Sequence, residues 1–257
     1  MHKILGMNIQ QNYNKIQTYR SRINSKAKSD SAILAHLAYL KVRGELSHIR
    51  KGVYLPSDMQ DKFRIACNSV DDACLVYHGA LEYYMLQTQE FNWLYVHSSS
   101  AFRTFNYMNQ SYIYKPVKFL YKPVVIDSGS SFPIRVTSLS QTIIDCLYNI
   151  NLAGGIEELL YALAEIKAES INEMDMIHCL EYYDNKSLYQ RTGFILEQFK
   201  ERLDLSDSFF ELCHEKIGKN ISYLINPYYC NSFSKKWNLC IPDNLQKQTK
   251  TELTYAI

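Results

Sequence analysis

The amino-acid sequence predicts an α+β fold, in which a small basic N-terminal module precedes a larger domain of helices and strands. The 257 residues are 47% hydrophobic and 21% charged, which is enough apolar material for a core and too little charge for a disordered chain. Positive charge is concentrated near the N-terminus, and helical and strand-like hydrophobic patterns alternate along the rest. We therefore expect two domains, residues 1–57 and residues 58–257.

The charge is distributed unevenly along the chain. Residues 1–54 contain ten basic and two acidic side chains, a net charge of +8, although the whole chain carries only +2. The remaining residues have a net charge of −6. A basic module joined to an acidic body is typical of a protein that binds a polyanion. The alternative is a solvated basic face without a partner.

Residues 29–43 have the pattern of an amphipathic helix. Ser29 or Asp30 can cap its start, because either side chain accepts a hydrogen bond from a first-turn N–H. Gly44 after Arg43 is a typical helix stop. The apolar positions that recur at helical spacing are Ile33, Leu34, Leu37 and Leu40. The side chains expected opposite or beside this stripe are Lys28, Ser31, Ala35, His36 and Tyr39.

Two strand-like pieces, residues 46–49 and 53–55, follow this helix and predict a hairpin. Gly52 between them can adopt the positive φ of a tight turn. A hairpin with Arg50 and Lys51 at its tip has the layout of a wing. Residues 9–23 predict a supporting helix, and only residues 20–29 remain for a second helix. Together these features predict a winged helix-turn-helix; a helix and hairpin used only for packing is the alternative.

A winged helix-turn-helix of this charge is expected to bind double-stranded DNA. A helix that presents short polar and small side chains can approach the major groove closely. The residues expected to face or flank the groove are Ser29, Ser31, Ala35, His36 and Tyr39. The residues expected to neutralise phosphates are Lys28, Lys41, Arg43, Arg50 and Lys51.

The rest of the chain predicts helices, then strands, then helices, which is typical of an α+β domain. Capping patterns in which an acidic residue or glutamine lies three residues after a serine predict helices starting at Ser69, Ser138 and Ser170. Helical spacing of apolar residues predicts further helices over 156–166, 188–203 and 206–217. Strand-like runs occupy residues 93–96, 112–119, 124–126, 133–136, 221–225 and 237–241.

The order of these elements and three of their motifs resemble the AbiE antitoxin family of bacterial type IV toxin–antitoxin, abortive-infection operons. The motifs are RKGVYLP at 50–56, SVDDACLVYHGAL at 69–81 and VTSLSQTIID at 136–145. The sequence departs from the family pattern at Ser140 and Gln141, where the family has a glutamate–arginine pair.

The resemblance implies a transcriptional autorepressor that binds its own promoter DNA at inverted repeats. It also implies an antitoxin that opposes a nucleotidyltransferase-like toxin without forming a stable complex with it.

Enzymatic alternatives have weaker support in the sequence. The neighbours His178-Cys179 and Cys213-His214 lack the spacing of zinc ligands. Cys74 and His78 could form a nucleophile and base on one helix face. Asp127 with Glu82 or Asp145 could form the carboxylate cluster of a metal-dependent nuclease. We predict no catalytic residue, metal ligand or cofactor, and we keep a DNA-independent protein-interaction module as the main alternative.

Location follows from what the sequence lacks. No run approaches the roughly 20 apolar residues that cross a bilayer, and the first ten residues lack the apolar core of a signal peptide. The seven scattered cysteines contain no C-x-x-C pair, so reduced thiols are expected. We therefore expect a cytoplasmic protein with no membrane partner.

Overall fold

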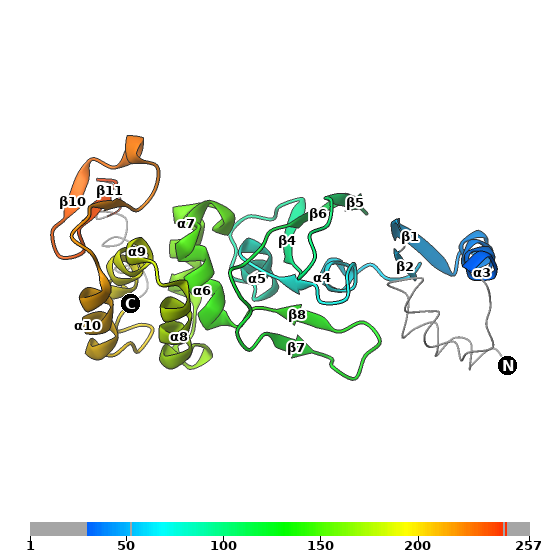
Figure 1. Cartoon of the computed structure of the whole chain (residues 1–257), viewed down its shortest axis with the longest axis horizontal. Coiled ribbons are helices and arrows are strands. Elements are labelled where there is room, and N and C mark those ends of the chain that lie inside the picture. The colour runs from blue at the N-terminus through cyan, green and yellow to red at the C-terminus, as the bar shows by residue number, and fades with distance from the viewer. Residues whose placement is uncertain (1–29, 52, 244, 246–257) are drawn as a thin grey trace. The chain divides into compact units, whose positions relative to one another are not determined.

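The computed structural model describes residues 30–51, 53–243 and 245 (Figure 1). Helices and strands are both present in quantity, so the predicted α+β class is confirmed. The chain forms two compact units. The first comprises the described residues up to Tyr83 together with Glu90–Thr137, and the second comprises Tyr84–Gln89 together with the described residues from Ser138 onward. The domain boundary predicted after residue 57 falls within the first unit and stays a prediction.

The first unit begins with α3 (Asp30–Val42) and a hairpin of β1 (Leu46–Arg50) and β2 (Val53–Pro56). Gly44 has a φ of +73°. The amides of Gly44 and Glu45 donate to the carbonyls of Lys41 and Leu40, each at 3.0 Å, which is a Schellman ending. The predicted helix and its glycine stop are thus confirmed. The supporting helix expected over 9–23, and residues 20–29, which remain for a second helix, lie outside the described residues, so the winged helix-turn-helix stays a prediction.

A six-stranded mixed sheet forms the body of the first unit, with strand order β5-β6-β4-β3-β8-β7 (Figure 1). Its strands are β3 (Cys74–Leu75), β4 (Trp93–His97), β5 (Phe105–Tyr107), β6 (Gln110–Tyr114), β7 (Val124–Ile126) and β8 (Ile134–Val136). The β3–β8 and β4–β6 pairs are parallel and the other pairs are antiparallel. Two short helices, α4 (Lys62–Cys67) and α5 (His78–Tyr83), pack against this sheet.

The helix predicted from Ser69 is wrong over its first half. Cys74 and Leu75 form the central strand β3, and only the segment from His78 is helical. Both strand residues are fully buried, and a strand buried on both faces lacks the polar–apolar alternation that distinguishes it from a helix. The Asp72 carboxylate accepts a hydrogen bond from the Ser99 amide at 2.7 Å instead of supporting a helix start.

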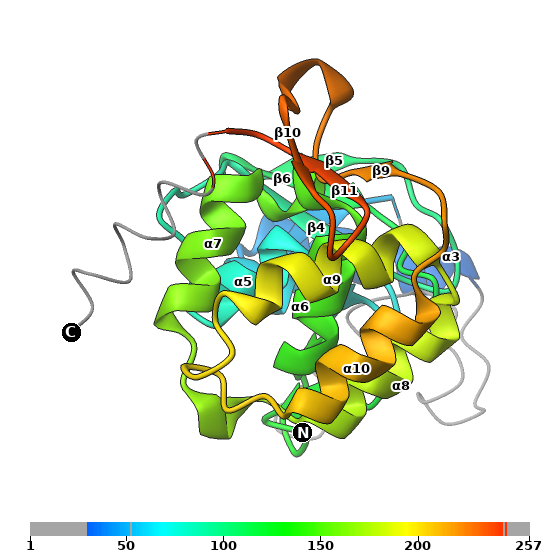
Figure 2. The same cartoon turned by 90° about the vertical axis from the view of Figure 1, so that its left-hand side faces the viewer.

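The second unit consists of five helices and a small sheet of strand order β10-β11-β9 within the described residues (Figure 2). The helices are α6 (Leu139–Tyr148), α7 (Ile156–Glu165), α8 (Glu173–Tyr183), α9 (Lys186–Glu197) and α10 (Asp207–Lys216). The strands are β9 (Ser222–Tyr223), β10 (Ser232–Ser234) and β11 (Leu239–Ile241). Single-turn 3₁₀ helices are η1 (Ile150–Ala153), η2 (Ala168–Ser170) and η3 (Pro227–Tyr229).

Two of the helix starts in this unit test the capping predictions. The Ser138 hydroxyl accepts from the Gln141 amide at 3.3 Å, so the predicted start of α6 is confirmed. The start predicted at Ser170 is wrong, because Asn172 caps α8 and accepts from the Asp175 amide at 3.0 Å. Glu173, expected in that capping box, instead accepts hydrogen bonds from the amide and hydroxyl of Ser206.

Helix α9 packs closely against the segment that leads into strand β11 of the small sheet. Gly193 lies against the ring of Trp237, and a Cβ at this position would overlap that ring. Trp237 is 1% exposed, and its indole N–H donates to Glu197 at 2.9 Å. Helix α9 ends at Glu197, six residues before the predicted end at 203, although Phe199 and Leu203 are buried as expected.

Candidate nucleic-acid interface

The helix–hairpin module, residues 30–51 and 53–56, has a small core on one side of α3. Leu37 and Leu40 are buried, as are Ile49 and Leu55 of the hairpin. The opposite face of α3 is open to solvent and carries Ala35, Ala38, Tyr39 and Val42 at helical spacing. This division is what a groove-binding helix requires, because one face anchors the helix and the other remains available.

The structure describes some of the residues predicted to face or flank the groove. Ala35 and Tyr39 are exposed, and His36 is half-buried with its ring stacked near Tyr39, the centroids 6.4 Å apart. Ser31 lies in the first turn of α3. Lys28 and Ser29 lie outside the described residues. Of the expected groove residues whose side chains the structure describes, Ala35 and Tyr39 therefore lie on the exposed face and His36 lies at its edge.

Two residues on this face were missed by the sequence analysis. Val42 is 88% exposed and Ala38 is also exposed, and both follow Ala35 at helical spacing. That spacing was a usable signal, because positions i, i+3 and i+7 share one side of a helix. An exposed valine in a groove-binding helix can contact the methyl group of thymine.

Arg43 belongs to an exposed cluster at the C-terminal end of α3. Its Nη1 donates to the Tyr39 hydroxyl at 3.1 Å, its Nε lies 2.9 Å from Glu45 Oε1, and its guanidinium lies over the Tyr39 ring. The hydrogen bond to Tyr39 and the charge of Glu45 raise the pKa of Arg43. These contacts orient the guanidinium while leaving half of the side chain exposed. Lys41 is exposed beside it.

Arg50 and Lys51 were both expected to contact phosphate, but their side chains lie in different surroundings. The Arg50 guanidinium lies over the rings of Phe102 and Phe105, 5.3 and 5.7 Å from their centroids, and donates to the Ser69 carbonyl at 3.3 Å. Burial lowers its pKa. Lys51 is exposed in the hairpin turn. Arg50 therefore links the hairpin to the body of the first unit, and Lys51 is the more accessible charge.

The candidate catalytic groups have other partners. Asp127 pairs with Arg64, and Glu82 pairs with Lys62. Asp145 is buried on α6 and accepts a hydrogen bond from the Tyr183 hydroxyl at 2.6 Å, and burial raises its pKa to about 8. The described residues contain no group of three or more His, Cys, Asp or Glu side chains that could hold a metal ion.

The cysteines that the sequence offered as candidate nucleophiles or metal ligands do not lie in the geometry that these roles require. Cys74 lies in β3 and His78 in α5, so they do not share a helix face, and the expected geometry is wrong. Burial raises the pKa of Cys179 and of Cys213 to about 12. A raised pKa keeps both thiols in the neutral form, which does not suit a nucleophile.

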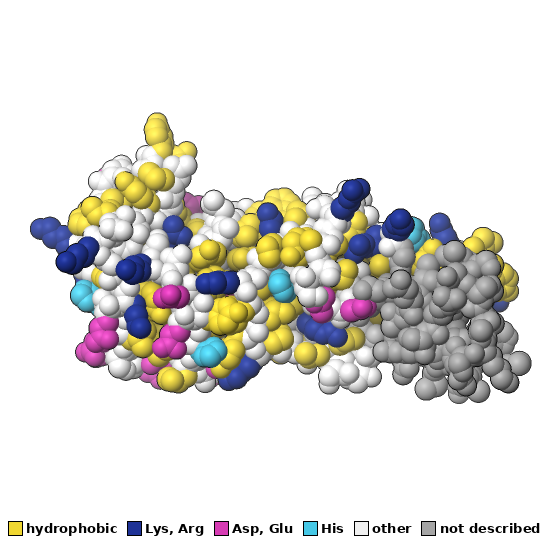
Figure 3. Space-filling model, viewed as in Figure 1, with side chains coloured by type: hydrophobic (Ala, Val, Ile, Leu, Met, Phe, Trp, Pro, Cys, Tyr) yellow, Lys and Arg dark blue, Asp and Glu magenta, His cyan; other side chains and the backbone are white. Residues whose placement is uncertain are grey.

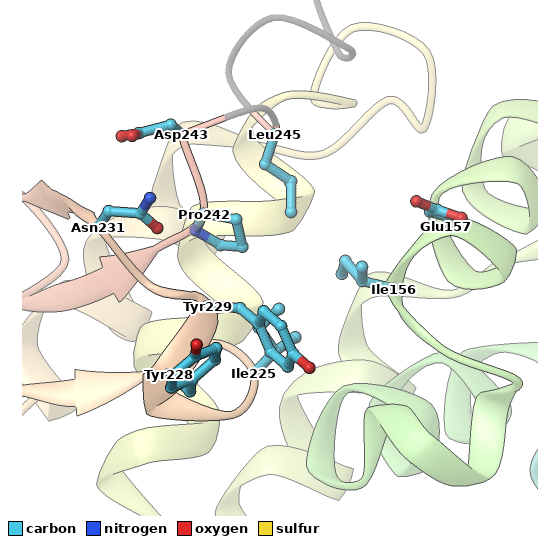
Figure 4. Close-up of a pocket in the computed structure, with 9 residues that line it drawn as sticks. All are labelled: Ile156, Glu157, Ile225, Tyr228, Tyr229, Asn231, Pro242, Asp243 and Leu245. Carbon is cyan, nitrogen blue, oxygen red and sulfur yellow. The ribbon is translucent and has the colours of Figure 1, made fainter.

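A pocket of ≈ 410 Å³ lies in the second unit between the start of α7 and η3 (Figure 4). Tyr229 and Ile156 project toward it from opposite sides, and its charged lining residues are Glu157 and Asp243. Figure 3 shows hydrophobic side chains over the projecting segment around η3, where Tyr228 is 86% exposed. Acidic lining residues repel a polyanion, so this pocket is not part of the candidate nucleic-acid interface.

Every helix in the described part of the chain is too short or too polar to span a lipid bilayer. A scan against models of known protein families and a search of curated proteins found no match to this chain.

Proposed function

We propose that this chain is a double-stranded DNA-binding protein in which α3 enters the major groove. The observation that best supports this proposal is the solvent-exposed face of α3. This face presents small side chains beside Tyr39, and the basic residues Lys41 and Arg43 lie at its C-terminal end. The hairpin that follows exposes Lys51 in its turn, where a wing contacts phosphate. Small side chains allow close approach of a helix to base edges.

The roles within this interface divide by chemistry. Tyr39 offers a hydroxyl to base edges and Val42 a methyl surface to thymine, and we assign both to sequence preference. Lys41, Arg43 and Lys51 neutralise phosphates and set affinity. The expected contacts of Lys28, Ser29 and Ser31 belong to the same proposal.

In the cell, the DNA-binding protein would act as an autorepressor and as the antitoxin of a type IV abortive-infection operon. This part of the proposal is supported by the resemblance carried by residues 50–56, 69–81 and 136–145. Its DNA partner is the promoter of its own operon, with inverted repeats as the site. Its second partner is a nucleotidyltransferase-like toxin, which it opposes without a stable complex.

The DNA proposal is tested by fluorescence anisotropy with a duplex taken from upstream of the gene. The double variant Lys41→Gln/Arg43→Gln should bind at least about tenfold more weakly at 150 mM salt, because it loses two phosphate contacts. The control Lys216→Gln/Lys219→Gln removes two exposed charges from the second unit and should bind normally. Equal affinities of the two double variants would overturn the assignment of α3.

The antitoxin proposal is tested by co-expression with the product of the adjacent gene. Growth arrest caused by that product should be relieved by the full chain and by the Lys41→Gln/Arg43→Gln variant, since the resemblance implies that the second predicted domain, residues 58–257, opposes the toxin. An adjacent product that is not toxic, or toxicity that the chain leaves unchanged, would contradict this part while leaving DNA binding to stand.

A second candidate is a protein-interaction module without a DNA role. The exposure of Val42, at 88%, favours it, because isolated apolar side chains on a helix can anchor a partner helix. A duplex that shows no binding at any salt concentration would favour this candidate over the first.

A further inference from the structure

A second pocket of the second unit, of ≈ 590 Å³, has a lining unlike that of the pocket in Figure 4. It lies at the end of α6, the first turns of α9 and the segment after β9. Its polar lining side chains include Asn149, Asn151, Asn185, Asn226 and Ser187. Arg191 is the charged lining residue, and the described lining contains no aspartate or glutamate.

The guanidinium of Arg191 is fixed in place by backbone carbonyls. Its Nε donates to the Tyr223 carbonyl at 3.1 Å and its Nη1 to the Tyr148 carbonyl at 3.2 Å. A guanidinium has five N–H donors, so these two bonds leave three for another acceptor. Because both anchors are main-chain atoms of ordered elements, the orientation of the group is set before any ligand arrives.

Arg191 has no acidic partner among the described residues. No carboxylate in the described part of the chain forms an ion pair with it, and burial lowers its pKa. A partly buried cation without a counter-charge is unfavourable, and an anion that enters the pocket relieves that cost. In the pocket of Figure 4, by contrast, the charged lining residues are acidic, so of these two pockets the one lined by Arg191 is the one expected to attract an anion.

The donors around this pocket come from three separate segments. Arg191 contributes a guanidinium, and Asn149, Asn151 and Asn226 can contribute amide N–H groups from the two other segments. The positive end of α9, at Asn185 and Ser187, adds a favourable field for negative charge. A phosphate group has acceptor oxygens pointing in several directions, so it can accept hydrogen bonds from donors on separate segments. The volume falls in the range of small-molecule sites.

We propose that this pocket binds the phosphate group of a small phosphorylated molecule, with Arg191 as its principal ligand. This site lies in the second unit and is independent of the DNA proposal, which concerns α3. Occupancy would make the second unit responsive to a phosphorylated metabolite.

The test is titration calorimetry of the full chain with inorganic phosphate, at ionic strength held constant with chloride. Saturable binding is expected, and acetate at the same concentration should bind at least tenfold more weakly. Arg191→Lys keeps the charge but loses the fork of donors, and should weaken phosphate binding several-fold. Arg191→Gln should abolish it.

Because Arg191→Gln also removes two structural hydrogen bonds, a second variant keeps the test independent of folding. Asn151 is exposed and its side chain lines the pocket, so Asn151→Asp adds a negative charge there and should weaken phosphate binding at least tenfold. Asn231→Asp adds the same charge beside the pocket of Figure 4 and should leave the affinity unchanged.

The proposal is overturned if phosphate shows no saturable binding, if acetate binds as well as phosphate, or if Asn151→Asp binds phosphate like the unaltered chain. None of these outcomes affects the DNA proposal, because the titration contains no DNA.

Discussion

The helix–hairpin module and the second unit place arginine in opposite environments. Arg43 at the end of α3 is half-exposed, and its hydrogen bond to Tyr39 and the charge of Glu45 raise its pKa. Arg191 on α9 is held by two main-chain carbonyls, and burial lowers its pKa. An exposed cation on the helix surface suits exchange of counterions along a polyanion, whereas a partly buried cation held by two carbonyls suits one small anion. The difference suggests two binding functions on one chain.

Arg50 shows that position in a hairpin alone does not define a phosphate contact. Its guanidinium packs on Phe102 and Phe105, so it contributes to cohesion of the first unit, whereas Lys51 next to it remains exposed. Neighbouring basic residues can therefore have different roles, which variants can separate.

The largest expected loss of stability is in the tightly packed second unit. Gly193→Ala should lower the free energy of unfolding by about 3 kcal/mol, since the added methyl group overlaps the Trp237 ring. Chemical denaturation followed by tryptophan fluorescence measures this change. Gly129→Ala, where a Cβ meets no atom within 4 Å, is the matched control and should change stability little. Equal stabilities of the two variants would mean that the packing around α9 is not as described.

The next effect concerns the pH dependence of the second unit. Burial raises the pKa of Asp145 to about 8, so the native state holds a proton that the unfolded state releases above about pH 4. Stability due to this group is therefore complete below about pH 4 and is lost as the pH rises toward 8. Asn resembles the protonated acid, so Asp145→Asn should gain stability relative to the unaltered chain by up to about 1.4 kcal/mol per pH unit.

Denaturation of both proteins between pH 5 and pH 8 measures this difference. A difference in unfolding free energy that stays constant across the range would show that Asp145 does not titrate differently in the native state.

A smaller effect separates the two basic residues of the hairpin. Arg50→Ala should destabilise the first unit by about 1 kcal/mol, because the guanidinium loses its contacts with two aromatic rings and the Ser69 carbonyl. Thermal unfolding measures the loss. If Arg50→Ala leaves stability unchanged and instead reduces the salt dependence of DNA binding, Arg50 is a phosphate contact as first predicted.

Lys51→Ala is the counterpart and should have the smallest effect on stability, within about 0.5 kcal/mol. It should make the salt dependence of DNA binding shallower by about one unit of slope, the loss of one phosphate contact. An unchanged slope would exclude the hairpin turn from the interface.

Local signals in the sequence identified several elements correctly. Gly44 ends α3, and Ser138 and Ser206 cap α6 and α10, because a stop or cap depends on the residue itself and a few neighbours. Strand β3 was not predictable in this way, since two fully buried residues carry no periodicity. The contacts of the two candidate binding sites could not be predicted from local sequence either. The packing of Arg50 on Phe102 and the anchoring of Arg191 to Tyr223 join residues distant in sequence.

The central claim is that the positive side chains of the helix–hairpin module meet duplex phosphates, and the salt dependence of binding to the duplex from upstream of the gene tests it most directly. With four phosphate contacts, from Lys28, Lys41, Arg43 and Lys51, the logarithm of affinity should fall linearly with the logarithm of salt concentration, with a slope of about −3 to −4. In the double variant Lys41→Gln/Arg43→Gln, this slope should become shallower by about two units. Binding that is independent of salt, or a slope that the double variant leaves unchanged, would contradict the account.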